Sequence, residues 1–513
     1  MDKNFYITTP IYYPSAKPHM GHAYSSIIAD FFARFKRIDG FKVHFLTGTD
    51  EHGLKIQRSA EKKGLKPLQF CDEISKTFRN LSEILNLTNT DFIRTTESRH
   101  KTSVQHLWKE LEKNDDIYLS KYSGWYSVSD EAFYSEDEIE EINGSKVATS
   151  SKSTVEWVDE ESYFFRLSKW EKPLLEFYEK NPGFISPESR KNEVVSFVKS
   201  GLKDLSISRK SFSWGIKVPG NENHVIYVWL DALTNYISAL NYPNTKEKLF
   251  KSFWPASIHL IGKDILRFHA VYWPAFLLAA KIDLPKKVYG HGWILSGDEK
   301  MSKSKGNILD PIEIVNEYGL DSLRYYLIKE VSFGNDGNIS QERLEDCINS
   351  DLANNFGNLC QRVTAFAIKN CDSKIPKKIE FNDDDYKILN NYKDNIELIR
   401  EKIDNQDINF YINFIVNSLF EANKYFNDQE PWNKKEDLLR LNTIVFTTLE
   451  IVRKVSFLLY PIIPESSIKA LKIFGINEAD INLSSLENND FLSKVDKIYK
   501  IDILFKKIEK KDD

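Results

Sequence analysis

The sequence predicts a parallel α/β domain that is interrupted by an inserted module and followed by a bundle of helices. Two short β-rich runs, at residues 4–8 and 42–47, each lead through a Gly- or Pro-bearing turn into a helical pattern, as at 24–35 and 54–63. This alternation returns at 224–233 and 257–280, after a stretch rich in Ser, Tyr and acidic residues. Apolar residues then recur three and four apart up to residue 460, which is typical of packed helices.

These patterns also give the expected boundaries. Helical spacing continues at 70–85 and 101–113, and the change of composition begins near Ile117. Because the α/β pattern resumes later, we expect strands from both sides of the insertion to complete one sheet. We expect the first half of the α/β domain at 1–116, the inserted module at 117–221, the second half at 222–335, the helix bundle at 336–475, and a tail at 476–513 whose charged end is disordered.

The composition argues against a membrane protein and against a disulfide-rich secreted one. No apolar run approaches the roughly 20 residues that cross a bilayer, and the first dozen residues lack the features of a signal or transit peptide. The four cysteines form no CxxC pair, which favours reduced thiols. We therefore expect a cytoplasmic protein. A net charge of −5 decides nothing about nucleic acid, because 70 Lys and Arg residues can still form basic faces.

A possible phosphate site lies at the first junction of strand and helix, in "PHMGH" (18–22). The free N–H groups and the dipole at a helix N-terminus attract anions, and Gly21 leaves room for close approach. His19 and His22 offer hydrogen bonds to phosphate oxygens. Taken alone, however, two histidines at this spacing also occur by chance.

A second basic motif lies at "GDEKMSKSKGN" (297–307), where Lys300, Lys303 and Lys305 recur in a glycine-flanked loop. Lysine provides a compact charge that suits a departing pyrophosphate. A solvated basic loop would have the same composition. The two motifs together are far less expected by chance than either one.

With these motifs the sequence resembles the class I aminoacyl-tRNA synthetases and, from residue 4 to about 470, the methionyl-tRNA synthetases. "PHMGH" and "KMSKS" (300–304) match the two class signatures. The resemblance implies a Rossmann-type catalytic domain split by a connective module, an anticodon-binding bundle, and methionine–tRNA ligase activity. Its substrates are then L-methionine, ATP with Mg²⁺, and both elongator and initiator tRNA(Met). The resemblance assigns catalysis to His19, His22, Lys300 and Lys303, and ATP binding to these four with Gly21, Asp264 and Ser302.

The narrower resemblance rests on "YVWLDALTNY" (227–236) and "GKDILRFHAVYWP" (262–274). A thioether is polarizable and offers little to hydrogen-bond, so an apolar and aromatic wall fits it. Asp50, in "GTDEHG", would pair with the substrate's ammonium group, although a capping Asp in a turn is the competing interpretation. Without the resemblance, the aromatic residues could equally be core. The methionine site implied is Ile11, Tyr13, Asp50, Trp229, Leu233, Tyr236, Ile265, His269 and Trp273.

A third region indicates RNA recognition. Asn358 and Arg362 lie four apart on one helical face, and Trp432 follows Pro431 at a helix end. Such side chains read and stack unpaired bases, although a Trp after Pro is often a packing anchor. The resemblance implies that these three residues read the CAU anticodon.

The inserted module departs from the many methionyl enzymes that bind zinc there through CxxC pairs. Ser127 and Asp130 stand where thiolates would be, and no cysteine occurs between 72 and 346. We therefore expect no structural metal. Two alternatives remain: a class I ligase for Leu, Ile, Val or Cys, although this insertion is short for an editing domain, and a catalytically silent tRNA-binding relative, although both signatures are complete. Little chain follows Tyr460, so we expect a monomer.

Overall fold

The structure is a computed structural model that describes residues 3–15, 17–127, 132–142, 144–296, 299–300 and 309–509. It divides into two compact units. Unit 1 comprises Met1–Lys3, Asp30–Lys42 and Gly292–Asp513, and unit 2 comprises Asn4–Ala29 and Val43–His291. The end of the predicted tail, at 510–513, lies outside the described residues.

Unit 2 is built on a six-stranded sheet whose registered pairs β1/β14, β14/β15, β15/β9 and β2/β3 are all parallel. The central strands β1 and β14 are buried over most of their length, and most of their residues are apolar. Since β1 lies beside β14, strands from both sides of the insertion complete the sheet, as predicted. The strand order is β3 (Asp91–Arg94), β2 (Lys42–Thr49), β1 (Asn4–Thr8), β14 (Ile258–Gly262), β15 (Val288–His291) and β9 (Ile185–Ser186).

The helices of this unit follow the apolar periodicity. In α4, Val104, Leu107, Trp108 and Leu111 recur on one face and are buried. Helix α3 has Pro67 at its first position, where a missing N–H costs nothing. The predicted helices at 24–35, 54–63, 70–85 and 101–113 are confirmed. The helices are α1 (Met20–Ile38, which continues into unit 1), α2 (Leu54–Lys62), α3 (Pro67–Ile84), α4 (Ser98–Lys113), α7 (Val228–Leu233), α8 (Asn235–Ser238), α9 (Lys248–Phe253) and α10 (Trp273–Ala279).

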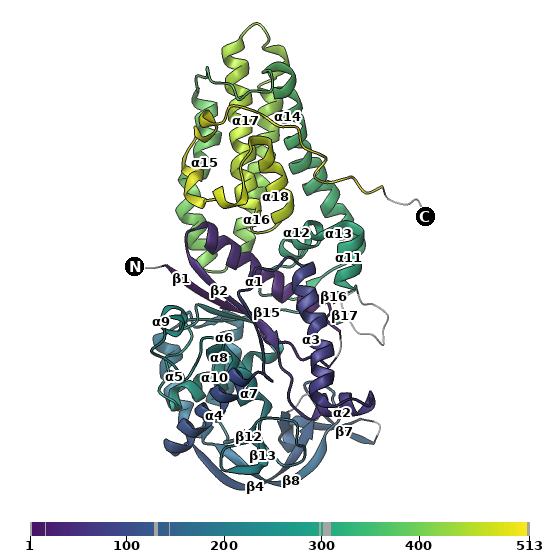
Figure 1. Cartoon of the computed structure of the whole chain (residues 1–513), viewed down its shortest axis with the longest axis vertical. Coiled ribbons are helices and arrows are strands. Elements are labelled where there is room, and N and C mark those ends of the chain that lie inside the picture. Colours follow the sequence, from purple (N-terminus) through teal and green to yellow (C-terminus); the bar gives the residue numbers. More distant parts are fainter. Residues whose placement is uncertain are drawn as a thin grey trace. The chain divides into compact units, whose positions relative to one another are not determined.

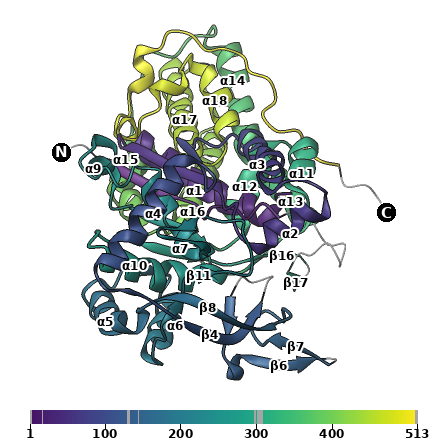
Figure 2. The ribbon, with the colours of Figure 1, turned by 60° about the horizontal axis from the view of Figure 1, so that its bottom comes forward.

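The insertion forms antiparallel sheets of its own. The strands β4 (Ile117–Ser127) and β8 (Glu156–Phe165) pair along their length and are seen side by side in Figure 2. One element of the predicted module behaves differently, because β9 joins the main sheet beside β15. The remaining elements are β5 (Ala132–Tyr134), β6 (Ile139–Ile142), β7 (Ser145–Ala148), α5 (Glu171–Lys180), α6 (Glu188–Lys199), β10 (Leu205–Ser206), β11 (Ser208–Arg209), β12 (Lys217–Val218) and β13 (Asn221–Ile226).

Unit 1 contains the predicted helix bundle, in which α15, α16 and α17 pack against one another (Figure 1), together with the segment from Gly292 that was expected in the α/β domain. Helix α17 is buried almost throughout, and Asn382 caps α15 in a reciprocal pair with Asp385. Small strands lie before and between the first helices of this unit. The elements are β16 (Ile294–Ser296), β17 (Glu299–Lys300), α11 (Pro311–Tyr318), α12 (Leu320–Glu330), β18 (Gly337–Asn338), α13 (Gln341–Cys347), α14 (Asn358–Asn370), α15 (Asp383–Asp404), α16 (Ile408–Asp428), α17 (Leu438–Leu459) and α18 (Pro464–Leu471).

All four cysteines are free thiols, and three of them are buried. Within the described ranges, no helix combines the length and the apolar character that crossing a bilayer requires.

Candidate active site

Unit 2 contains a cavity of about 290 Å³ near the carboxyl ends of β1, β2 and β14. In open parallel sheets this edge is where ligands bind. We call this space the methionine cavity, after the ligand that the sequence predicts for it. It is lined by Pro10, Ile11, Tyr13, Asp50, Lys55, Val228, Trp229, Ala232, Leu233, Asn235, Tyr236, Asp264, Ile265 and His269.

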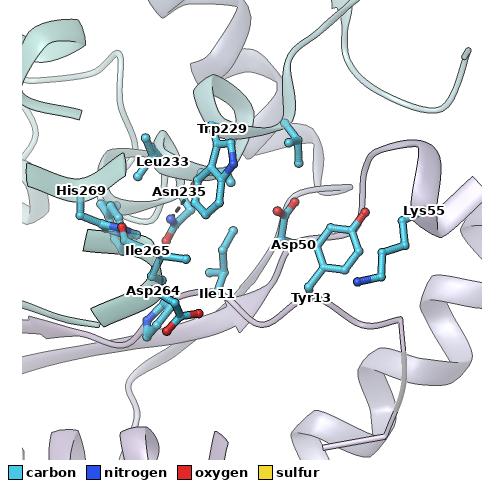
Figure 3. Close-up of a pocket in the computed structure, with 14 residues that line it drawn as sticks. Ile11, Tyr13, Asp50, Lys55, Trp229, Leu233, Asn235, Asp264, Ile265 and His269 are labelled. Atoms are coloured by element: carbon cyan, nitrogen blue, oxygen red, sulfur yellow. Dashed lines mark hydrogen bonds between the residues drawn. The ribbon is translucent and has the colours of Figure 1, made fainter. Parts of the chain in front are cut away.

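Backbone pairing holds the first loop against the end of β2. The N–H of Tyr12 donates to the carbonyl of Gly48 over 2.8 Å, and the N–H of Asp50 donates to the carbonyl of Tyr12 over 2.9 Å. Gly48 is required here, because a Cβ at that position would lie 2.0 Å from the carbonyl oxygen of Ile93. As a result, Asp50 lies beside Tyr13 at the cavity, as Figure 3 shows.

Helix α7 and the segment after β14 supply an apolar and aromatic wall. The indole of Trp229 stacks on Phe268, with ring centroids 3.7 Å apart and planes 7° from parallel. Leu233 is buried, and Figure 3 shows it on the same side of the cavity as His269. A π-helical turn at Phe268–Tyr272 brings His269 to the cavity.

The polar groups of this wall bond to one another. His269 donates from Nδ1 to the carbonyl of Ile265 over 3.0 Å, and its Nε2 accepts from the hydroxyl of Tyr236 over 2.7 Å. Burial lowers the pKa of His269 to about 4, so its ring is neutral at pH 7 and one nitrogen is an acceptor. Neither side chain can donate to a ligand without breaking an existing bond.

The cavity gathers all but one of the nine residues predicted for methionine. The exception is Trp273, which is fully buried behind Tyr236, with ring centroids 6.1 Å apart. Asp264, predicted for ATP, also lines the cavity. The sequence reasoning missed Pro10, Lys55, Val228, Ala232 and Asn235, although the last three lie inside a quoted motif.

The two histidines of "PHMGH" lie together at the start of α1, with ring centroids 3.8 Å apart. The N–H of His19 donates to Nδ1 of His22 over 3.0 Å, and the N–H of Gly21 donates to Nδ1 of His19 over 3.1 Å. With Nδ1 as an acceptor, the hydrogen of each neutral ring is on Nε2. Glycine at position 21 leaves space for this arrangement, because a Cβ there would lie 3.0 Å from Cε1 of His19.

His22 is the more enclosed of the pair. Its ring contacts Tyr12 and Phe78 edge to face, with centroids 4.7 and 5.3 Å away. Burial, assisted by the neighbouring His19, lowers the pKa of His22 well below its usual value. His22 is therefore a neutral donor through Nε2 at pH 7.

Only part of the lysine motif can be described. Lys300 belongs to β17, which pairs with β16 in register Leu295 to Lys300. Ser302 and Lys303 lie outside the described residues, as does Asp130 of the insertion. Ser127 is buried at the end of β4. Among the residues that can be described, His, Cys, Asp and Glu form no group of three suited to a metal ion.

The three residues predicted to read RNA form what we call the Arg362 surface of unit 1: Asn358, Arg362 and Trp432. Arg362 donates to Oδ1 of Asn427 over 2.7 Å, and its guanidinium lies 5.4 Å from the ring centre of Phe426. Trp432 contacts the same Phe426 edge to face at 6.1 Å and is 40% exposed. Asn358 is exposed at the first position of α14, one turn before Arg362.

Comparison with known proteins gives consistent matches over nearly the whole chain. A family model described as "tRNA synthetases class I (M)" matches residues 5–145 and 140–364, and one described as "Anticodon binding domain of methionyl tRNA ligase" matches 375–513. The chain is 51% identical to a methionine–tRNA ligase of Brucella suis over 92% of each chain. It is 48% identical to that of Rickettsia conorii, over 99% of this chain and all of the relative.

Solved structures agree with this assignment. A Mycobacterium tuberculosis methionyl-tRNA synthetase in complex with methionyl-adenylate superposes with a TM-score of 0.96 and 44% identity, over 98% of this chain and 99% of that one. The apo form of that enzyme gives a TM-score of 0.90 and 40% identity, over 99% of each chain. The chain belongs to the methionyl-tRNA synthetase family of the class I aminoacyl-tRNA synthetases, and its activity is that of a methionine–tRNA ligase.

Proposed function

We propose that the methionine cavity holds the amino acid by its two ends. Asp50 pairs with the ammonium group, while Trp229, Leu233 and Ile265 surround the thioether side chain. The single observation that supports this best is the cavity itself, which joins the buried carboxylate of Asp50 to an apolar wall. Thus the charged end of the substrate meets an opposite charge, and its side chain meets groups that suit sulfur.

Selection against other amino acids follows from the bonded pair at the wall. Tyr236 and His269 already satisfy each other, so a side chain that brings a polar group would have to be buried without a partner. A thioether demands no such bond. Trp273 packs behind Tyr236 and supports the wall without lining the cavity.

Activation is proposed to follow in one displacement. The methionine carboxylate attacks the α-phosphorus of ATP in line, and Mg²⁺-bound pyrophosphate leaves. His19 and His22 donate from Nε2 to phosphate oxygens as negative charge shifts, beside Gly21 and the start of α1. Lys300 and Lys303, with Ser302, stabilise the departing pyrophosphate, and Asp264 contacts the adenylate end. No protein nucleophile is needed, since positioning and charge supply the catalysis.

In the second step the 2′-hydroxyl of the terminal tRNA ribose takes the methionyl group and AMP leaves. The Arg362 surface is proposed to read the CAU anticodon of both elongator and initiator tRNA. Its support is the exposed Trp432, which offers a face for stacking, beside the hydrogen-bonding groups of Asn358 and Arg362.

The proposal also covers the oligomeric state, the location, the domain boundaries and the metal content of the enzyme. The enzyme works as a monomer in the cytoplasm, with domain boundaries at 116/117, 221/222, 335/336 and 475/476. It needs Mg²⁺ with ATP but no structural zinc, because residues 117–221 contain neither Cys nor His. Elemental analysis of the purified protein tests the zinc expectation, and one equivalent of tightly bound zinc would contradict it.

The test of the pocket is pyrophosphate exchange with ATP, run without tRNA on methionine, norleucine and glutamine. Norleucine replaces the sulfur by a methylene, and glutamine adds an amide at similar length. We expect exchange in the order methionine, norleucine, glutamine, with glutamine lowest by several orders of magnitude in kcat/KM. Comparable exchange with glutamine would overturn the proposed pocket.

A further inference from the structure

Outside the lining of the methionine cavity, three buried ionisable groups form a chain of hydrogen bonds that the reaction does not use directly. Nδ1 of His52 lies 2.6 Å from Oδ2 of Asp231, and Nε2 of His100 lies 2.7 Å from Oδ1 of the same carboxylate. The side chains of Asp231 and His100 are fully buried, and that of His52 is 3% exposed. We call these residues the Asp231 triad.

The triad joins the two parts of the chain that face each other across the cavity. His52 lies two residues after Asp50, in the turn that follows β2, and its carbonyl accepts a hydrogen bond from the hydroxyl of Tyr13 over 3.1 Å. Asp231 lies on α7 between Trp229 and Leu233. The triad therefore connects the proposed ammonium site to the apolar wall. His100 extends this connection to α4.

The hydrogen positions explain why this connection is strong. The hydroxyl of Ser238 lies 2.7 Å from the carbonyl of Thr234 and 2.8 Å from Nδ1 of His100, so a hydrogen bond holds that nitrogen in place. Nε2 of His100 faces a carboxylate, which can only accept, so this nitrogen donates. His100 is thus held between Asp231 and Ser238.

The carboxylate fits this description. Burial alone would raise the pKa of Asp231, but the charges and hydrogen bonds of His52 and His100 outweigh burial and lower the pKa to about 2. A charge-assisted bond on each oxygen is stronger than a bond between neutral groups, so the carboxylate is fixed in place.

We propose that the Asp231 triad is a positioning element that sets the distance between Asp50 and the wall formed by Trp229 and Leu233, and so controls the KM for methionine. The inference rests on the proposed methionine cavity. None of the three side chains lines the cavity, so they act through the segments that carry the contacts. A shift of one ångström in such a contact is enough to cost roughly a hundredfold.

The experiment compares His100→Leu, His100→Gln and Asp231→Asn in pyrophosphate exchange, with KM measured separately for methionine and for ATP. Leucine removes both ring nitrogens, whereas glutamine keeps a donor that reaches Asp231. We expect the methionine KM to rise roughly tenfold to a hundredfold in His100→Leu, with partial rescue in His100→Gln. The KM for ATP and the kcat are expected to stay within twofold.

The matched control is His224→Gln. His224 is fully buried on β13 of the same unit and contacts Ser208, but it lies outside the cavity lining. A role in folding alone would lower the melting temperature and the active fraction in His224 and His100 variants alike, without moving the methionine KM. An unchanged methionine KM in folded His100→Leu and Asp231→Asn would overturn the inference.

The isosteric Asp231→Asn variant decides the question if His100→Leu fails to fold. Failure of the inference also differs from failure of the proposed pocket. If Asp50→Asn leaves the methionine KM unchanged, the pocket assignment is wrong. If Asp50→Asn raises it while the triad variants do not, only the positioning role is wrong.

Discussion

The methionine cavity of unit 2 and the Arg362 surface of unit 1 are two proposed recognition sites that differ in burial. Asp50 is 6% exposed and its neighbours at the cavity are bonded to other parts of the protein, whereas Trp432 is 40% exposed. In the cavity, Asp50, Leu233 and Tyr236 are buried before any ligand binds. At the Arg362 surface, the exposed part of Trp432 would be buried only when RNA binds.

This difference determines what a substitution at each site disturbs. A buried group belongs to a network, so its loss affects both affinity and the stability of unit 2. An exposed group that gains its partner on binding affects affinity alone. The predictions below separate the two cases.

The largest effect is expected for Asp50→Asn. This substitution replaces the buried counter-charge of the methionine ammonium group by a neutral amide, which costs roughly two to three orders of magnitude in kcat/KM for methionine. Pyrophosphate exchange measures it, and Asp159→Asn on the insertion sheet is the exposed control. A loss below tenfold would mean that the buried charge of Asp50 contributes no more to methionine binding than an exposed charge would.

The next effect is expected for His22→Ala, which removes a donor to phosphate. We expect kcat for exchange to fall roughly a hundredfold, as for oxyanion donors in general, with the methionine KM nearly unchanged. For Lys300→Ala we also expect kcat for exchange to fall roughly a hundredfold while the methionine KM stays nearly unchanged. An unchanged rate would remove the residue from the mechanism.

The third prediction concerns stability and pH. Buried His269 stays neutral in the folded protein down to a pKa of about 4, whereas the unfolded chain takes up the proton near 6.5. The unfolded state thus binds more protons between these values, and the free energy of unfolding falls as the pH is lowered through that window. Relative to pH 7, His269 alone should remove about 2 kcal/mol at pH 5.

Denaturant unfolding of the wild type and of His269→Gln at both pH values measures this contribution. The variant is expected to lose less stability on acidification, by about the amount assigned to His269. Equal losses in the two proteins would contradict the buried, neutral state of the ring.

The smallest effect is expected for Trp432→Ala. Loss of one stacked base costs about 1–3 kcal/mol, so we expect charging of tRNA(Met) to fall roughly tenfold or more in kcat/KM. Pyrophosphate exchange and melting temperature are expected to stay unchanged, because Trp432 is 40% exposed. Tyr499→Ala, which removes another exposed ring of unit 1, is the matched control. A large drop in melting temperature would mean that Trp432 stabilises the fold of unit 1, as a buried residue does.

The fold was predictable in segments where the apolar residues follow a helical period over several turns. Helices α3 and α4 were found within a few residues, because their apolar positions recur over several turns. Strand β9 was not predicted, because a strand of two residues shows no periodicity. Its pairing partner β15 lies about a hundred residues later and is brought beside it only by folding. The long inserted strands were seen only as a change in composition.

The site was predictable through its motifs and not through its contacts. Asn235 lies inside a quoted motif, yet only the turn into α8 brings it to the cavity. Bonds of the Asp231 triad join residues 131 and 179 positions apart, and no local pattern marks such a pairing. Sequence reasoning found the residue types of the site but not the network that holds them.

The neighbouring position of β1 and β14 has a consequence for biosynthesis. Thr8 pairs with His259, a partner 251 positions later in the chain. At translation rates of roughly 5–20 residues per second, strand β1 waits roughly ten to fifty seconds for that neighbour to be made. During this interval one edge of the young sheet is unpaired, and such edges are templates for wrong pairing. The nascent chain therefore needs protection on the ribosome until the segment around residue 260 has emerged.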